Sequence, residues 1–267
     1  MAVLTISREF GSGGREIGHA VARSLSYEIV DKERILNDTR KAGTEWEQWS
    51  KELDERSPSV WERYDWSFRG FVALIQSIML DYALRDRVVL MGRGGNFLLV
   101  DIPYALRVRI KAPIQQRIDR IMKRETVDMD TAKWLIEKTD RERSGFIRSI
   151  YGMDWDDPAC FDLVFDTEKS KPDEIIENLV AGLTERDRYC NEGCRNTVRL
   201  RREVARIKAG LLINPDLFLP TLDVELEGDT VVLKGVVHNP KERDRLTGEA
   251  RRLAGNLRLR YDIRYRG

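Results

Sequence analysis

Cysteine and histidine are scarce in this chain, which has three Cys and two His among 267 residues. An odd and small number of cysteines excludes a disulfide framework and fits a reducing compartment. No apolar run reaches the length of about 18 residues that a membrane-spanning helix needs. The opening residues 1–7 also lack the basic leader and cleavage region of a signal peptide. We therefore expect a cytoplasmic protein without a transmembrane segment.

Net charge is also nearly absent, at +1, but it is unevenly distributed. Residues 197–267 carry 15 Lys/Arg and 10 Asp/Glu, so the preceding 196 residues have a net charge of −4. The two parts of the chain differ electrostatically. An excess of five positive charges is too weak to indicate nucleic-acid binding, which needs a concentrated basic stripe. We do not expect nucleic acid as a partner.

Short apolar segments alternate with helical patterns over the first two thirds of the chain. Strands are expected at residues 2–7, 28–31, 88–91, 106–110 and 162–166. Helices are expected at residues 15–25, 114–125, 128–149 and 172–186, with three more within 32–86. This alternation predicts an α/β fold, a parallel sheet with helices on both faces. Such sheets bind ligands at the carboxyl ends of their strands.

The pattern changes after a segment at 188–196 that lacks apolar periodicity, which we interpret as a linker. Residues 197–267 then follow the order α-β-β-α-β, with a hairpin at 222–237 and a strictly alternating strand at 257–265. This predicts a small α+β domain with two helices on one face of its sheet. The last strand directs four arginines outward: Arg258, Arg260, Arg264 and Arg266.

The glycine-rich turn after the first strand is the main candidate for chemistry. Residues 9–16, Glu-Phe-Gly-Ser-Gly-Gly-Arg-Glu, can be aligned with the phosphate-loop pattern G-x-x-x-x-G-K-[ST], with Gly14 and Arg15 at the Gly-Lys positions. Glycines let backbone N–H groups curl around phosphate oxygens, and the following helix directs its positive end at them. We predict that the nucleotide is bound by Gly11, Ser12, Gly13, Gly14, Arg15 and Glu16.

Two positions depart from that pattern. Glu9 stands at the first glycine, and Glu16 stands where a Ser or Thr would hold Mg²⁺. A glycine turn between a strand and a helix can also be purely structural, so the motif by itself leaves both interpretations open.

The glycine-rich block belongs to a set of segments that resembles a known family. Residues 6–18, together with 30–32, 92–94, 138–143 and 154–158, look like the cytidylate kinase-like family of P-loop nucleoside monophosphate kinases. The resemblance covers about residues 1–187 and implies a three-layer fold with a nucleotide-binding loop and an arginine-bearing lid. It also implies ATP-dependent phosphoryl transfer to a nucleoside monophosphate such as CMP, with ATP and Mg²⁺ as cofactors.

Arginines are abundant where that chemistry would need them. Phosphoryl transfer between two anions requires dense positive charge and a lid that excludes water. Arg117, Arg120 and Arg124 share one helix face. Our predicted catalytic residues are Arg15, Arg120, Arg141 and Arg143. The alternative for any one of them is a solvated surface arginine.

The acceptor side is predicted from two residues at strand ends. Arg93 lies in a glycine turn after the third strand, where a packing role is hard to assign. By resemblance it matches the arginine of a Gly-Arg-Asp turn that binds acceptor phosphate, but Gly94 replaces the aspartate, which questions cytosine as the base. Asp31 either contacts the acceptor or metal-bound water, or simply caps the next helix.

The C-terminal segment, about residues 197–267, resembles a BON domain, which implies a module that binds proteins or membranes without chemistry of its own. Its outward arginines would suit an anionic partner, or they would only prevent edge-to-edge aggregation. The sequence predicts no metal site made of side chains alone. A second functional hypothesis is a catalytically degenerate nucleotide sensor that signals through this module, because the Lys-Ser/Thr pair is missing from the loop.

Overall fold

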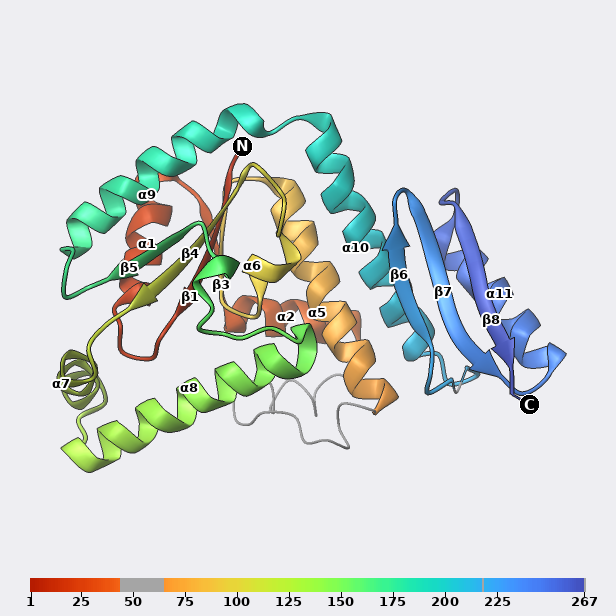
Figure 1. The fold of residues 1–267 in the computed structure, drawn as a ribbon, viewed down its shortest axis with the longest axis horizontal. Coiled ribbons are helices and arrows are strands. Elements are labelled where there is room, and N and C mark those ends of the chain that lie inside the picture. The colour runs from red at the N-terminus through yellow and green to blue at the C-terminus, as the bar shows by residue number, and fades with distance from the viewer. Residues whose placement is uncertain (44–64, 218, 267) are drawn as a thin grey trace.

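The computed structural model describes residues 1–43, 65–217 and 219–266. A five-stranded parallel sheet forms the first domain, with the order β2-β3-β1-β4-β5 (Figure 1). Its strands are β1 (Val3–Arg8), β2 (Glu28–Val30), β3 (Val88–Met91), β4 (Ala105–Lys111) and β5 (Leu163–Asp166). All five strands expected from the sequence are present, and the predicted α/β class is confirmed.

Helices cover both faces of this sheet because its central strands are apolar on both sides. Helices α1 (Gly14–Leu25) and α9 (Pro172–Arg186) pack on one face in a single core cluster. The opposite face is covered by α5 (Trp66–Arg85), with α2 (Lys32–Ala42) beside it. Part of the region 32–86, for which three helices were predicted, lies outside the described residues.

The carboxyl ends of the strands meet at one edge of the sheet. Strand β1 ends there and leads through the glycine-rich turn into α1, and β3 leads into the short helix α6 (Gly95–Leu98). Helices α7 (Ile114–Glu125) and α8 (Met129–Tyr151) follow β4, and α8 runs along this edge in Figure 1. The two pack against each other through a small apolar cluster that includes Ile118, Ile121 and Ile136.

A separate small domain follows, with a three-stranded sheet of order β6-β7-β8. Strand β6 (Asp223–Glu227) pairs antiparallel with β7 (Thr230–Val237), which pairs parallel with β8 (Leu259–Tyr265). Helix α11 (Pro240–Ala254) packs on the inner face of this sheet together with the end of α10 (Glu192–Leu212). The predicted order α-β-β-α-β is confirmed.

Helix α10 belongs to both cores. Val198 and Ala205 are buried against the α5 side of the first domain, whereas Ile207 and Leu211 are buried in the C-terminal core. The helix begins at Glu192, inside the segment expected to be a linker, because Asn191 caps it by accepting a hydrogen bond from the Cys194 N–H at 3.0 Å. None of the helices that the structure describes has the length and apolar character that a membrane span requires.

Candidate active site

The glycine-rich turn is a tight loop whose conformation depends on two glycines. Gly11 and Gly13 have φ values of +81° and +85°, in the left-handed region that favours glycine. Gly13 is also the N-cap of α1 and has no side chain to satisfy the first-turn N–H groups. Those N–H groups and the positive end of the helix dipole are therefore available to an anion.

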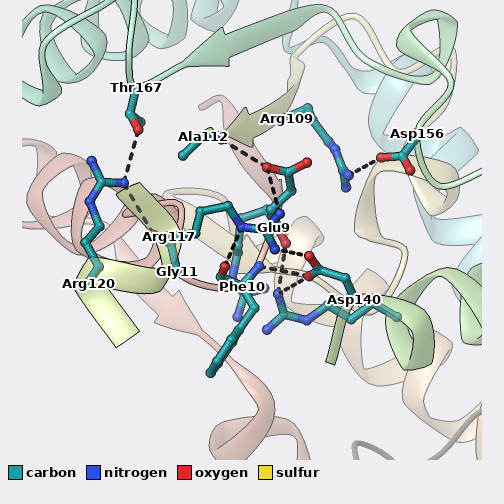
Figure 2. A network of polar contacts seen from close by, with 12 residues as sticks. Glu9, Phe10, Gly11, Arg109, Ala112, Arg117, Arg120, Asp140, Asp156 and Thr167 are labelled. Carbon is teal, nitrogen blue, oxygen red and sulfur yellow. Dashed lines mark hydrogen bonds and ion pairs between the residues drawn. The ribbon is translucent and has the colours of Figure 1, made fainter. Parts of the chain in front are cut away.

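Helix α7 presses against the loop and fixes its shape. A Cβ on Gly11 would lie 3.1 Å from the carbonyl oxygen of Arg117 and 3.1 Å from Ile121 Cγ1. Arg120 donates hydrogen bonds from Nη1 to the Gly11 carbonyl at 3.3 Å and to Thr167 Oγ1 at 3.1 Å (Figure 2). The predicted catalytic residue Arg120 thus touches the loop itself.

A buried ion-pair network anchors the first half of the loop (Figure 2). Arg117 donates from Nε to the Phe10 carbonyl at 2.8 Å and pairs with Asp140 of α8. Asp140 also accepts the Phe10 N–H at 2.9 Å. Glu9 accepts the Ala112 N–H at 3.0 Å and lies 3.6 Å from Arg117. Glu9, a departure from the phosphate-loop pattern, therefore ties the loop to the end of β4.

Two neighbouring cavities open at this edge of the sheet. The larger, about 1140 Å³, surrounds residues 8–17 and is closed on the far side by α7 and the start of α9. The smaller, about 270 Å³, lies over the turn at 92–94 and is bounded by α8 and Trp155. Three residues line both cavities: Arg8, Phe10 and Arg143. A ligand in one cavity would therefore face a ligand in the other across these side chains.

Three arginines gather where the cavities meet. Burial and the charge of Arg143 lower the pKa of Arg8 to about 9. Burial and the charges of Arg8 and Arg143 lower the pKa of Arg93 to about 9. Burial likewise lowers the pKa of Arg143 to about 10, against the opposing effect of Asp140. Three guanidinium groups in a partly dehydrated cleft form an arrangement that favours the binding of an anion.

The turn at residues 92–94 is left-handed throughout, with φ of +81° at Gly92, +56° at Arg93 and +75° at Gly94. Such a conformation is strained for arginine and is held by its surroundings. Tyr151, at the end of α8, donates its hydroxyl to the Arg93 carbonyl at 3.0 Å. A Cβ on Gly94 would lie 2.5 Å from Tyr151 Cζ. The tyrosine ring occupies the space that an aspartate at position 94 would need.

Residues 154–157 form a turn that also covers a buried charge. Arg109 of β4 is only 1% exposed and pairs with Asp156, while its guanidinium lies 3.8 Å from the centre of the Trp155 ring. Asp157 caps a 3₁₀ turn by accepting the Ala159 N–H at 2.9 Å. Besides forming this turn, the acidic residues thus supply an ion pair that fixes the wall of the smaller cavity.

The structure separates the predicted site residues into groups. Those that line the larger cavity are Gly11, Ser12, Gly13, Gly14, Arg15, Glu16 and Arg120. Arg143 lines both cavities, and Arg93 lines the smaller one. Arg141 is exposed on α8 and lines neither. Asp31 caps α2 by accepting the Arg34 N–H at 3.2 Å, and its charge also reaches Arg8 and Arg93.

Arg8 was not predicted from the sequence. It stands one residue before the pattern as we aligned it, at the last position of β1, where a strand residue is expected to be structural. The one available signal was its place directly before the glycine-rich turn, at the carboxyl end of the central strand.

Comparisons with known proteins identify the family and the fold of residues 3–169. A model of the cytidylate kinase-like family matches residues 3–169. A cytidylate kinase of Thermoplasma acidophilum is 26% identical over 188 residues, which are 69% of this chain and 95% of that protein. A cytidylate kinase of Methanocaldococcus jannaschii is 29% identical over 171 residues, 62% of this chain and 89% of that protein. An uncharacterized protein from Eubacterium ventriosum has a similar fold, with a TM-score of 0.53 and 20% identity over 69% of this chain and 99% of that one.

Proposed function

Because the chain belongs to the cytidylate kinase-like family, we propose that it transfers the γ-phosphoryl group of ATP to a nucleoside monophosphate. The observation that carries this proposal is the pair of cavities that share Arg8 and Arg143. A two-substrate phosphotransferase needs two adjacent anion sites with positive charge at their junction, since its catalysis is mostly positioning and electrostatic stabilisation.

The larger cavity is the proposed ATP site. Its wall contains the glycine loop, whose uncapped first-turn N–H groups would donate to the β- and γ-phosphates. Arg15, exposed on the first turn of α1, and Arg120, bonded to the loop, would add cationic charge on two sides. A volume of about 1140 Å³ is large enough for a nucleoside triphosphate.

The smaller cavity is the proposed acceptor site. Arg93 would bind the acceptor phosphate from the left-handed turn, and Asp31 would contact the acceptor near the same turn. Position 94 is glycine and offers no carboxylate to the acceptor base, and the Tyr151 ring fills the space that an aspartate side chain there would need. The base is therefore to be found by experiment, with CMP as the first candidate from the names of the relatives.

Mg²⁺ fits this site only in part. No group of three or more His, Cys, Asp or Glu side chains among the described residues is arranged to hold a metal ion. Mg²⁺ keeps several water ligands and is commonly bound through one or two carboxylates and substrate phosphates. Glu16, on the first turn of α1 at the larger cavity, is the carboxylate that would complete such a shell. Bound there, magnesium would supply charge neutralisation at the phosphates.

In the proposed reaction an oxygen of the acceptor phosphate forms a bond to the γ-phosphorus. The bond from that phosphorus to the bridging oxygen of ADP breaks, and its electron pair leaves with ADP. The products are ADP and a nucleoside diphosphate, and no proton transfer is needed when the attacking phosphate oxygen is ionised. Arg143, donating to the Arg8 carbonyl at 2.9 Å, lies at the junction where the transferring group would pass.

The test is a phosphoryl-transfer assay with the full chain, ATP, Mg²⁺ and a panel of nucleoside monophosphates including CMP, UMP, AMP and their deoxy forms. We expect nucleoside diphosphate from at least one acceptor, with turnover falling on Arg93→Gln. No product with any acceptor would reject the proposal. If ATP still raised the melting temperature, the degenerate nucleotide sensor would be favoured, since ligand binding stabilises without turnover.

The C-terminal domain is proposed to act as a binding module for a protein or another anionic partner. Its outer sheet face is less basic than the sequence suggests, because Arg260 pairs with Glu227 at 2.5 Å and Arg258 with Asp229 at 3.0 Å. A partner would have to compete with these pairs, which are exposed and individually weak. Salt-dependent association of the full chain with such a partner, lost on replacing Arg260, would support this role.

A further inference from the structure

Arg8 and Gly14 lie too close together for both residues to carry a side chain. A Cβ built on Gly14 would lie 2.8 Å from Arg8 Cβ and 3.4 Å from Arg8 Cγ. A separation of 2.8 Å between two carbons fixed to their backbones is shorter than side chains tolerate. Ile110 Cβ, at 3.2 Å, closes the same space from β4. Any residue with a side chain at position 8, arginine included, therefore requires glycine at position 14.

These two positions become significant when the phosphate-loop pattern is shifted by one residue. The pattern G-x-x-x-x-G-K-[ST] then runs over residues 8–15, with Arg8 at its first glycine and Gly14 at its lysine. Gly13 falls on the second glycine and has a φ of +85°, which only glycine adopts readily. Relative to this pattern, the chain gains a cationic side chain at position 8 and loses one at position 14. The two residues concerned, Arg8 and Gly14, are in direct contact.

The Arg8 side chain is directed along the cleft. Its Nη1 lies 2.7 Å from where a Cβ of Gly92 would be, so the guanidinium extends from the loop to the acceptor turn. It lines both cavities together with Arg143, whose Nη1 donates to the Arg8 carbonyl at 2.9 Å. Gly92, with φ of +81°, has no side chain, which leaves room for the Arg8 guanidinium beside it.

We propose that Arg8 replaces the phosphate-loop lysine, and that its guanidinium binds the transferring phosphoryl group between the two nucleotides. This inference rests on the proposed function for the identity of the reaction. The bond changes are those given above, and Arg8 remains protonated while it neutralises the charge shared by the attacking and leaving oxygens. A planar guanidinium donates two parallel hydrogen bonds to phosphate oxygens in a fixed geometry, whereas a lysine ammonium acts as a compact point charge. Position 14 is glycine because the Arg8 side chain fills the space that a side chain there would need.

The first experiment separates charge from shape at position 8. Arg8→Gln and Arg8→Lys are compared with wild type in turnover and in binding of a non-hydrolysable ATP analogue. We expect Arg8→Gln to lower kcat by roughly 10²-fold to 10³-fold. Arg8→Lys should retain part of the activity, because it keeps the charge. Arg148→Ala, exposed on α8 and lining neither cavity, is the control and should match wild type.

The second experiment tests the exchange itself. Gly14→Ala should impair the wild-type loop more than it impairs an Arg8→Gly protein, in which only the Ile110 Cβ contact at 3.2 Å remains. Arg8→Gly/Gly14→Lys, which recreates the lysine-bearing loop, should exceed Arg8→Gly alone by about tenfold in kcat/KM. Additive losses, or a double variant no better than Arg8→Gly, would overturn the inference. Melting curves show whether each variant is folded.

These results distinguish the two proposals. If wild type turns over an acceptor and Arg8→Gln turns over equally well, the inference about Arg8 fails and the kinase assignment stands. If wild type turns over no acceptor, the kinase assignment fails. In that case, loss of ATP-analogue binding in Arg8→Gln and its return in Arg8→Gly/Gly14→Lys would still establish Arg8 as the phosphate-binding cation. Unchanged binding in Arg8→Gln would then reject that role as well.

Discussion

Asp140, in the middle of helix α8, accepts the backbone N–H of Phe10 in the glycine loop at 2.9 Å. The same carboxylate pairs with the buried Arg117, which in turn donates to the Phe10 carbonyl at 2.8 Å. The backbone N–H and the carbonyl of Phe10 are therefore both hydrogen-bonded to the ion pair between Arg117 of α7 and Asp140 of α8. The loop conformation and the position of α8 are coupled through these contacts.

Replacing Asp140 by alanine should destabilise the fold and reduce catalysis together. Arg117, whose side chain is only 9% exposed, would lose its main partner. Removing one member of such a buried pair costs about 3–5 kcal/mol. We expect a lower melting temperature and a kcat reduced more strongly than ATP-analogue affinity, since α8 carries Arg143. Thermal denaturation and steady-state kinetics measure both effects.

Glu137→Ala is the matched control, because Glu137 is an exposed acid three residues earlier on the same helix. It should leave both the melting temperature and kcat nearly unchanged. An Asp140→Ala protein as stable and active as this control would show that the ion pair does not couple α8 to the glycine loop.

The sheet and most helices could be predicted from the sequence because their signals are local. Continuous apolar runs such as residues 88–91 and the helical periodicity of 114–125 match β3 and α7 in the structure. Arg93 could be located because glycines flank it at a strand end. By contrast, the contact between Arg8 and Gly14 and the packing of Tyr151 against Gly94 join residues by tertiary structure. No spacing rule in a single sequence reveals such contacts.

Helix α10 shows the same limit at the level of domains. Its apolar residues were assigned to the C-terminal domain, and Ile207 and Leu211 do pack there. Val198 and Ala205 pack instead against the first domain. Periodicity identifies which residues of a helix are buried, but it does not identify the partner that buries them.

Gly94→Ala tests how closely Tyr151 closes the acceptor turn. Two costs are expected: the left-handed backbone, with φ of +75°, and the overlap with the tyrosine ring. Gly152→Ala is the control, because Gly152 has a φ of +66° but no atom within 4 Å of its Cβ position. Both variants should lose about 1–2 kcal/mol from backbone strain. Gly94→Ala should lose about 1–3 kcal/mol more from overpacking.

In kinetics, Gly94→Ala should raise the KM for the acceptor more than the KM for ATP, since the turn lines only the smaller cavity. In a Tyr151→Ala background, Gly94→Ala should lose only the part due to backbone strain, because the overlapping ring is absent. Equal losses of unfolding free energy for Gly94→Ala and Gly152→Ala, measured by chemical denaturation, would mean that the Tyr151 ring moves aside without destabilising the fold.

Nucleotide affinity should fall as the pH rises through about 9. Burial and mutual repulsion lower the pKa of Arg8 and of Arg93 to about 9 in the free protein. Bound phosphate favours the protonated guanidinium and raises both pKa values. Affinity is therefore full below pH 9 and is lost above it, by about tenfold between pH 8 and 9.5 if both groups contribute. Calorimetric titration with CMP, whose phosphate is proposed to bind at Arg93 beside Arg8, measures the change at constant ionic strength.

Arg8→Gln should reduce that pH dependence, because one of the two titrating groups is removed. The phosphate of CMP is fully ionised across this range and contributes no change of its own. An affinity that stays constant up to pH 9.5 in the wild-type protein would mean that the arginines at the junction of the cavities do not contact the nucleotide phosphates.

The dual role of α10 can be tested by truncation. A fragment of residues 1–187 lacks the helix, which exposes the α5 surface packed against Val198 and Ala205. It also loses the ion pair between Arg195 and Asp86 at 2.6 Å and the hydrogen bond from Arg201 to the Leu98 carbonyl at 2.9 Å. We expect this fragment to aggregate or to unfold without a cooperative transition.

A fragment of residues 1–213 keeps α10 and should melt cooperatively. Its melting temperature should rise when ATP analogue is bound, because the loop and both cavities lie within it. If residues 1–187 melted as sharply and bound the analogue as tightly as residues 1–213, α10 would belong to the C-terminal domain alone.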